Sequence, residues 1–563
     1  MWPLTHHGLF TAHDIWHQVA RLYHYHSVLS AGFWPPGWVI DLTHGFGYPL
    51  FYFSYHLPWL VGEPLLRLGL SLPVTLKVLF GGAVFLSGLT MYWFCWQLIR
   101  KTLPAVLGAV VYIVAPYHFL TVYVAAAIGT VFQFIFIPLM FGGAYLIIVK
   151  KTKTSGSVIL ALGIAGSVLS HLMSTVMVLP FLGIWSLVLL VMVARTNIKL
   201  WGMAIFKMGT GVLFGLLLSA FYLLPLFAYK PAIIADSAGG FRSLYSSHFV
   251  SLKQLLYSAW GFSPIVSNAK DREMSLQVGV VQWLGVGALF AMVFATVVSL
   301  WAQKSHQKVA KQFLSRLALT LDLRQSVVSG VAVLILFAVV CLSMLELAAP
   351  VWEFANRFMT LDYPWRLLLL AVFFGSTAVA LSLSYIKPLS MKVIFFVIII
   401  ASAWYTNRNH IGVNLYTDVP VADYVEAETT TNTFAEYLPR GASEDVTRVK
   451  DQPFILDSQG ISTITTQSAV AISAEVIASS SGTFTLRQFS FPTLAVYVDD
   501  TQVPSKNNNK GLIQIELEQG EHTVELKVVK PAIVRLGMAL TIASLLGLTG
   551  YILWNLKNLY VKK

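Results

Sequence analysis

Charged residues are scarce in this sequence, and so are cysteines. Asp, Glu, Lys and Arg make up 11% of the 563 residues, and the cysteines are Cys95 and Cys341 alone. Two cysteines inside apolar segments provide neither a disulfide framework nor a metal-ligand set. The chain also lacks a Gly-rich phosphate-binding motif after a strand and a His-Glu-x-x-His helix, which argues against dinucleotide and nucleotide enzymes and zinc hydrolases.

Apolar residues, in contrast, make up 56% of the chain, and the mean hydropathy is +0.69. A helix needs roughly 20 apolar residues to cross a bilayer, and such runs recur along the sequence. We therefore predict a polytopic α-helical membrane protein with about eleven spans. The predicted spans are 72–98, 104–120, 127–149, 157–171, 173–194, 202–228, 278–301, 327–347, 366–384, 392–405 and 531–554.

The distribution of Lys and Arg predicts the orientation of these spans, because short cytoplasmic loops retain positive charge. The cations that define the cytoplasmic side are Arg100, Lys101, Lys150, Lys151, Lys153, Arg195, Lys199, Lys304, Lys308, Lys311, Arg316, Arg324, Lys557, Lys562 and Lys563. The C-terminus is then cytoplasmic, and 1–71, 229–277, 348–365 and 406–530 face outward. The net charge of +12 reflects this topology and attraction to anionic membrane lipid, with no basic surface for nucleic acid.

The composition divides the chain into four regions. Residues 1–71 form a first outward loop with interfacial helices, and 72–405 form the transmembrane bundle. Between 406 and 530 the apolar runs give way to β-branched residues, which predicts an extracytoplasmic β-sandwich-like domain. Within it we expect a turn at Asp499-Asp500 and a hairpin around Gln519-Gly520. Residues 531–563 form the last span and a basic tail.

The first outward loop carries an unusual polar cluster, HDIWHQVARLYHYH at residues 13–26. In a helix, Asp14, His17, Arg21 and His24 fall on one face. An amphipathic helix at the membrane–water interface would explain this pattern without any chemistry. Thr11 and Asp14 also have the spacing of a capping box, which is the structural alternative for Asp14.

A second acidic residue, Asp41, follows in GFWPPGWVIDLTHGFGYPLFYFSYHLPWL, close to His44. Glycines and prolines predict an irregular backbone here, which at membrane depth is tolerated where it packs against protein or lines a cavity. Two carboxylates on such an outward loop are suited to act as a base and as a metal or substrate ligand.

These motifs resemble the first outward loop of bacterial multi-span proteins labelled 6-pyruvoyl-tetrahydropterin synthase-related, which with YfhO-type proteins are similar to the GT-C glycosyltransferases. Nearly the whole chain follows the family's motif order. The further motifs are APYHFLTVY, LSHLMST, FYLLPLFAY, HFVSLKQLLYSAWG, LQVGVVQWLG, DYPWR and the β-rich FPTLAVYVDDTQV. The resemblance implies a GT-C-like fold in the bacterial plasma membrane. It also implies a twelfth span before residue 1, which we expect upstream of this sequence.

The resemblance further implies transfer of a sugar from a polyprenyl-phosphate donor to a glycan, lipid or protein acceptor at the outer membrane face. Such transfer needs a carboxylate base and positive charge on the leaving phosphate. Asp14 matches the first-loop acidic residue and is the candidate base or ligand of a divalent cation, Mg or Mn, with Asp41 the second choice. The candidate substrate-binding histidines of this loop are His13, His17 and His44.

The candidate phosphate ligands lie in NRFMTLDYPWRLL. Arg366 is the first choice and Arg357 the second, because the planar guanidinium donates two hydrogen bonds to phosphate at once. The structural alternative is that Arg366 anchors its helix at the interface, paired with Asp362. His171, between two apolar spans, is a candidate for binding sugar or phosphate, or else a buried structural histidine.

The sequence departs from the family at Ala125 and Thr130, where an Arg and a Glu would align. This departure leaves two alternatives to a glycosyltransferase open, a non-catalytic membrane scaffold and a lipid or glycan transport protein of cell-envelope assembly. Transporters are often built from internal repeats, and the sequence shows none.

Overall fold

The computed structural model describes residues 2–152, 154–194, 196–234, 245–263, 273–304, 327–359, 361–426, 437–443 and 452–561. The chain forms two compact units. The first contains 1–15, 77–216 and 240–417, and the second contains 16–76, 217–239 and 418–563. Several of the predicted cytoplasmic cations lie outside the described residues: Lys153, Arg195, Lys308, Lys311, Arg316, Arg324, Lys562 and Lys563.

The protein is a multi-span membrane protein. Within the described residues, eight helices are long and apolar enough to cross a membrane, or up to ten if two bent helix pairs each form one span. The number is therefore lower than the eleven predicted. The predicted spans 104–120 and 327–347 are the two bent pairs, and the predicted span 157–171 is the short helix Ser155–Ser170.

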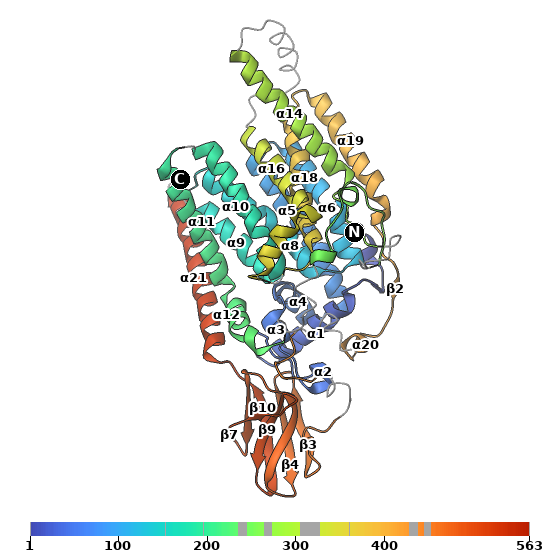
Figure 1. Ribbon diagram of the computed structural model, residues 1–563, viewed down its shortest axis with the longest axis vertical. Helices are drawn as coiled ribbons and strands as arrows, with labels where there is room; N and C mark the ends of the chain where they lie inside the picture. Colours follow the sequence, from blue (N-terminus) through green and yellow to red (C-terminus); the bar gives the residue numbers. More distant parts are fainter. Residues whose placement is uncertain are drawn as a thin grey trace. The chain divides into compact units, whose positions relative to one another are not determined.

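Helices dominate the first unit (Figure 1). They are α5 (Leu72–Ile99, which begins in the second unit), α6 (Thr102–Ile113), α7 (Pro116–Phe119), the π-helical turn η2 (Leu120–Val124), α8 (Ile128–Ile148), α9 (Ser155–Ser170), α10 (Leu172–Ala194), α11 (Ile198–Leu218), α13 (Leu252–Leu256), α14 (Val280–Lys304), α16 (Val327–Ser343), α17 (Ala349–Asn356), η6 (Pro364–Leu367), α18 (Leu368–Tyr385) and α19 (Leu389–Asn407). A short antiparallel pair, β1 (Leu9–Phe10) and β2 (Tyr416–Thr417), joins the two ends of this unit. Every residue of α18, from Leu368 to Tyr385, is buried, so α18 is the centre of the bundle.

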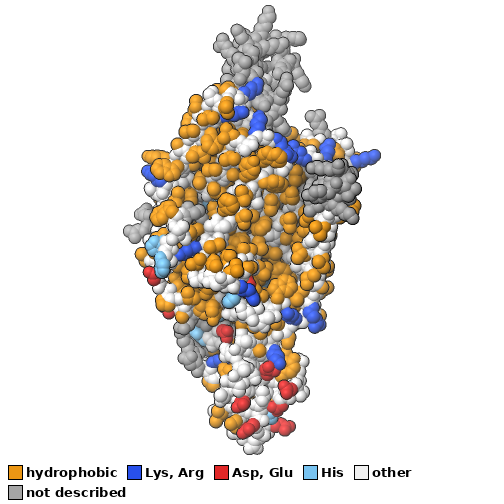
Figure 2. All heavy atoms as spheres, turned by 180° about the vertical axis from the view of Figure 1, so that it is seen from behind, with side chains coloured by type: hydrophobic (Ala, Val, Ile, Leu, Met, Phe, Trp, Pro, Cys, Tyr) orange, Lys and Arg blue, Asp and Glu red, His pale blue; other side chains and the backbone are white. Residues whose placement is uncertain are grey.

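Glycines bring α8 and α9 into close contact. A Cβ atom on Gly143 would lie 2.7 Å from the backbone nitrogen of Leu160, and one on Gly163 would lie 2.8 Å from that of Met140. Small residues allow membrane helices to pack backbone to backbone, where van der Waals contact replaces the hydrophobic effect. Hydrophobic side chains also cover a broad face of the helical part of the molecule, as expected for a surface in contact with lipid (Figure 2).

The predicted span 104–120 is a broken helix. α6 and the α7–η2 segment are bent by 44°, and Pro116 begins the second part. The bend exposes carbonyl groups that lipid cannot satisfy, and polar side chains of other helices bind them. Gln282 Nε2 of α14 donates to Val111 O at 3.2 Å, and Asn407 Nδ2 of α19 donates to Val114 O at 2.8 Å.

The second unit combines α1 (Ile15–Ser30), α2 (Leu42–Gly45), α3 (Leu50–Phe53), α4 (Leu57–Arg67), α12 (Ala220–Tyr229), α20 (Val421–Glu426), a β-domain and the last helix, α21 (Ala532–Val561). α12 and α21 lie side by side (Figure 1). The hydroxyl of Thr541 accepts a hydrogen bond from Phe221 N at 3.0 Å, and a Cβ on Gly537 would lie 2.7 Å from Ala220 O. The last span is thus tightly packed against α12.

The β-domain is a two-sheet sandwich. Its strands are β3 (Gly460–Ser468), β4 (Ala471–Ala478), β5 (Gly482–Phe489), β6 (Leu494–Val498), β7 (Thr501–Val503), β8 (Lys506–Asn507), β9 (Leu512–Leu517) and β10 (Gly520–Val528). One sheet has the order β3-β4-β10-β6-β7 and the other β5-β9-β8. Alternate residues such as Val476, Leu526 and Ile515 are buried between them, as the period of two requires.

The turn at Asp499-Asp500 is confirmed, because β6 pairs with β7 and both aspartates have positive φ. The hairpin predicted around Gln519-Gly520 is wrong. β9 pairs with β5 and β8, whereas β10 pairs with β4 and β6, so the chain crosses from one sheet to the other at this point. The alternating pattern of both strands is the same in either arrangement, and only the pairing partners distinguish them.

Candidate functional site

Three of the predicted site residues meet in the first unit, although the sequence separates them by almost 200 positions. Arg366 Nη1 lies 2.7 Å from His171 Nε2, and Arg366 Nη2 lies 2.8 Å from Asp362 Oδ2. His171 ends α9, and Asp362 and Arg366 lie at the start of the η6–α18 span. The side chains of Asp362 and Arg366 are 16% and 19% exposed, so this ion pair is largely removed from solvent.

The hydrogen bonds hold the ring of His171 on both sides. A guanidinium only donates, so His171 Nε2 accepts the hydrogen bond from Arg366. On the other side of the ring, Ser174 N donates to His171 Nδ1 at 3.2 Å, and the Ser174 hydroxyl lies 3.1 Å from the same nitrogen. The imidazole is thus fixed between the guanidinium and the first turn of α10.

The guanidinium keeps further N–H groups for a ligand. Arg366 Nε and the neighbouring Trp365 Nε1 are buried, and neither has a hydrogen-bond partner among the described residues. The centroid of the Tyr363 ring lies 5.2 Å from the guanidinium carbon, and the His248 ring packs against Tyr363 with 4.6 Å between centroids and a tilt of 59°. Buried donors without partners are rare in proteins, and a bound ligand or water is the usual explanation.

Arg357, the second candidate for phosphate, has a different environment. It lies at the end of α17, where its Nη2 is 3.3 Å from Glu353 Oε1. Both side chains are about two-thirds exposed, with values of 67% and 65%. An exposed pair of this kind contributes little to stability and leaves Arg357 in contact with solvent.

The structure places Asp14 at the end of the broken span. Asp14 N donates to Ala125 O, and His13 N donates to Val124 O, both at 3.0 Å. The backbone is irregular here, because Ala126 adopts a left-handed conformation with φ of +49°. The N-terminal segment thus lies against Ala125, the position where the family resemblance expects a charge. The predicted capping box of Thr11 and Asp14 is wrong, because α1 begins only at Ile15 and Asp14 N donates to Ala125 O rather than to the Thr11 hydroxyl.

The broken span connects the two parts of this candidate site. Ala125, beside Asp14, follows the last turn of its α7–η2 segment, and Tyr117 lies in the first turn of that segment. Tyr117 interacts electrostatically with both Arg366 and Asp362, and α7 packs against α18. At a helical rise of roughly 1.5 Å per residue, Tyr117 and Ala125 lie about 12 Å apart along the segment. His13 Nε2 is 2.7 Å from Phe262 O, which ties the N-terminal segment to a further part of the same unit.

Asp41 and His44 belong to the second unit, where their loop contacts the β-domain. We call residues 38–48 the clasp loop. Gln488 on β5, fully buried, donates from Nε2 to Gly45 O at 2.6 Å and to Ile40 O at 3.2 Å. The Trp38 indole donates to Gln488 Oε1 at 3.3 Å, and Phe489 N donates to Phe46 O.

The carboxylate of Asp41 takes part in the same contact. It accepts a hydrogen bond from Gln467 Nε2 of β3 at 2.6 Å. Burial raises the pKa of Asp41, although the bond from Gln467 and the nearby Arg487 act in the opposite direction. His44 has a positive φ of 53° within the loop. The structure thus gives Asp41 a docking contact, and its predicted role in catalysis stays a prediction.

His17 and the polar face of α1 are not exposed as an interfacial helix would require. His24 is buried, and Ile15, Val19 and Leu22 are buried as well, so α1 packs within the protein. Burial, together with the charge of Arg21, lowers the pKa of His17 to about 4. His17 is therefore neutral at physiological pH, and its Nδ1 has no hydrogen-bond partner among the described residues.

A divalent cation is not supported by the donor set. The described residues contain no group of three or more His, Cys, Asp or Glu side chains arranged to hold a metal ion. A Mg²⁺ or Mn²⁺ ion on Asp14 would need most of its ligands from substrate and water. Metal binding by Asp14 stays a prediction, and no step below depends on it.

Sequence reasoning did not identify Tyr117, Ser174 and Trp365 as neighbours of the cluster. Tyr117 belongs to the motif APYHFLTVY, which marked the segment but not the residue. Ser174 follows His171 by one helical turn, a spacing that predicts contact on a helix surface. Trp365 directly precedes Arg366 in the motif DYPWR, and only the structure shows that its indole nitrogen is buried.

No model of a known protein family matches the chain, and its sequence matches no curated protein. Among solved structures, the chain is similar to the archaeal oligosaccharyltransferase AglB from Archaeoglobus fulgidus, determined in complex with an inhibitory peptide and a dolichol-phosphate. The identity is 15% and the TM-score 0.33, with 80% of this chain and 54% of that chain covered. The chain thus spans about half the length of that protein, and a TM-score this low does not establish a shared fold.

Proposed function

We propose that this protein is an integral-membrane glycosyltransferase that moves a sugar from a polyprenyl-phosphate donor to a cell-envelope acceptor. The observation that carries the proposal is the Arg366–His171–Asp362 cluster. An ionisable group at the start of a fully buried span is costly, and such groups generally mark functional sites in membrane proteins. Arg366 is held at two nitrogens and offers its remaining N–H groups to an anion.

The proposed reaction uses the two ends of the α7–η2 segment of the broken span. The Asp14 carboxylate accepts the proton of the acceptor hydroxyl, whose oxygen forms a bond to the anomeric carbon of the sugar. The bond between that carbon and the phosphate oxygen breaks, and the lipid phosphate leaves with the electron pair. Arg366 stabilises the negative charge that develops on this oxygen. His171 and Asp362 fix the orientation of the guanidinium.

The alternative is a non-catalytic membrane scaffold, or a lipid or glycan transport protein. Ala125 and Thr130 favour it, because neither side chain can replace the charges expected from the family resemblance. In the structure Thr130 is buried on α8, and Ala125 contributes only its carbonyl to the contact with Asp14. Sugar transfer then needs a carboxylate from another part of the chain, and in this proposal Asp14 provides it.

The test is a transfer assay on the full chain in lipid, with a panel of radiolabelled polyprenyl-phosphate sugars. We expect Arg366→Gln to lower turnover by about 100-fold or more, the typical loss when a single charge-stabilising donor is removed. Arg357→Gln is the matched control, because it removes the same side chain from an exposed position, and it should retain turnover. Equal losses in both variants, or none in either, would contradict the proposed phosphate site. Folded protein that transfers none of the sugars would favour the scaffold.

A further inference from the structure

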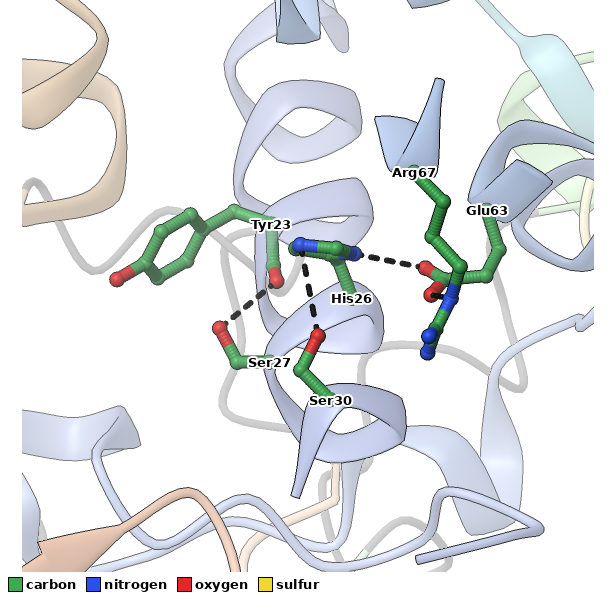
Figure 3. Close-up of polar contacts among 6 residues, drawn as sticks. All are labelled: Tyr23, His26, Ser27, Ser30, Glu63 and Arg67. Carbon is green, nitrogen blue, oxygen red and sulfur yellow. Dashed lines mark hydrogen bonds and ion pairs between the residues drawn. The ribbon is translucent and has the colours of Figure 1, made fainter. Parts of the chain in front are cut away.

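A separate group of polar side chains lies in the second unit, where α1 and α4 meet (Figure 3). His26 Nδ1 is 2.9 Å from Glu63 Oε2, and His26 Nε2 is 3.5 Å from the hydroxyl of Ser30, one turn further along α1. On its other oxygen, Glu63 Oε1 accepts a hydrogen bond from Arg67 Nε at 2.6 Å. An acid, a histidine and a serine thus form one continuous chain of contacts.

The contacts determine where the protons lie. Glu63 accepts from Arg67 and faces His26, so an ionised carboxylate requires the proton on His26 Nδ1. His26 Nε2 then carries a lone pair and accepts from the Ser30 hydroxyl. This is the proton arrangement in which a histidine acts as general base on a serine, with the acid holding the tautomer. The contact of 3.5 Å is long, as such contacts often are before substrate binds.

Burial differs along the chain of contacts in the way that this chemistry requires. The Glu63 side chain is 9% exposed, the His26 side chain is 35% exposed, and Ser30 is exposed at the end of α1. The acid is therefore inside the protein and the nucleophile at its surface. His26 also lies near the C-terminus of α1, where the helix dipole stabilises the imidazolium that forms when Ser30 loses its proton.

We propose that Ser30, His26 and Glu63 form a second, nucleophilic site that takes carboxylic esters. His26 removes the Ser30 proton, and Ser30 Oγ forms a bond to the ester carbonyl carbon. The carbon–alkoxide bond breaks, and the alkoxide leaves with the proton from His26. Water, activated by the same histidine, then releases the carboxylic acid and regenerates Ser30. Arg67 donates from Nε to Glu63 Oε1 and so orients the carboxylate that faces His26. This activity is independent of sugar transfer.

The helix provides a matched control for this site. The hydroxyl of Ser27 donates to Tyr23 O at 3.1 Å and has no part in the contacts with His26 (Figure 3). Both serines belong to the last turn of α1, so their substitution by alanine should have the same small effect on folding.

The experiment is covalent labelling of the full chain in lipid with a fluorophosphonate probe, at pH 8, followed by mass spectrometry of the peptides. We expect labelling at Ser30 that Ser30→Ala abolishes and Ser27→Ala leaves unchanged. His26→Gln should lower the labelling rate at least 10-fold, as should Glu63→Gln in protein with unchanged thermal stability. Absence of labelling in the unmodified protein, or labelling that persists in Ser30→Ala, would overturn the proposal.

Hydrolysis of p-nitrophenyl acetate provides a second readout of the same site. We expect a turnover that falls to the background rate in Ser30→Ala and is retained in Ser27→Ala. A turnover that is equal in both variants would assign hydrolysis to another part of the chain and overturn the proposed role of Ser30.

Discussion

Asp14 and Asp41 occupy comparable places in the first outward loop, but the structure gives them different surroundings. Asp14 lies against Ala125, where the backbone leaves a broken span and Ala126 has a positive φ. Asp41 lies in the clasp loop, where it accepts a hydrogen bond from Gln467 of the β-domain. Irregular backbone at the end of a span is typical of functional sites in membrane proteins, whereas a contact with a β-strand surface is typical of domain docking. The same residue type thus has two different environments.

The largest expected effect on stability is in the clasp loop. Gln488→Ala removes the side chain that hydrogen-bonds to the Trp38 indole and to the backbone carbonyls of Ile40 and Gly45. Each buried group left without a partner costs about 1–3 kcal/mol, so we expect a loss of about 3 kcal/mol or more. Limited proteolysis and thermal unfolding of the full chain would measure it. Gln519→Ala, at an exposed position, is the control, and equal stability of the two variants would show that the clasp loop does not hold the β-domain.

The next effect is in the first unit, at His171. His171→Ala removes the acceptor of Arg366 Nη1 and leaves the guanidinium held by Asp362 alone. A hydrogen bond to a charged group is worth about 1.5–3 kcal/mol, which corresponds to a loss of at least about 10-fold in kcat/KM for sugar transfer. The measurement is the transfer assay with the best donor of the panel. A variant with unchanged kcat/KM would show that His171 does not position Arg366.

The smallest effect is a pH dependence in the β-domain. Asp499 accepts from His522 at 2.7 Å, and this bond raises the pKa of His522 above its ordinary value of 6.5. The stabilisation is therefore complete below about pH 6.5 and is lost as the pH rises through the raised pKa. Because the pair is partly exposed, we expect only a few tenths of a kcal/mol. Thermal unfolding between pH 5.5 and 9 should show this loss of stability. If the pair is responsible, the stability of His522→Gln should depend less on pH over the same range.

The sequence predicted the parts of the fold that depend on composition. Long apolar runs marked α5, α8, α14 and α21 to within a few residues, because a span must match the thickness of the bilayer. The break in the second predicted span was missed. Its carbonyls are satisfied by Gln282 and Asn407, which are distant in sequence, and such contacts leave no local pattern.

The candidate site was predicted only in part as an arrangement. Arg366 and His171 were selected for their chemistry, and Asp362 was expected to pair with Arg366. The structure shows that pair and adds His171 to it. The contact between His26 and Glu63 was not foreseen, because the two residues lie on separate helices and no motif joins them. Spacing in the sequence reports contacts within one helix, such as that of His26 with Ser30, but not contacts between helices.

The most direct test of the central claim compares Asp14→Asn with Asp41→Asn in the transfer assay. If Asp14 is the base, Asp14→Asn should lower turnover by about 10²–10⁴-fold, the usual contribution of general base catalysis. Asp41→Asn should retain turnover and equal or greater stability. The amide oxygen still accepts from Gln467, and the substitution removes a buried charge whose pKa is raised. Turnover that survives in Asp14→Asn but is lost in a stable Asp41→Asn would contradict the account and move the site to the clasp loop.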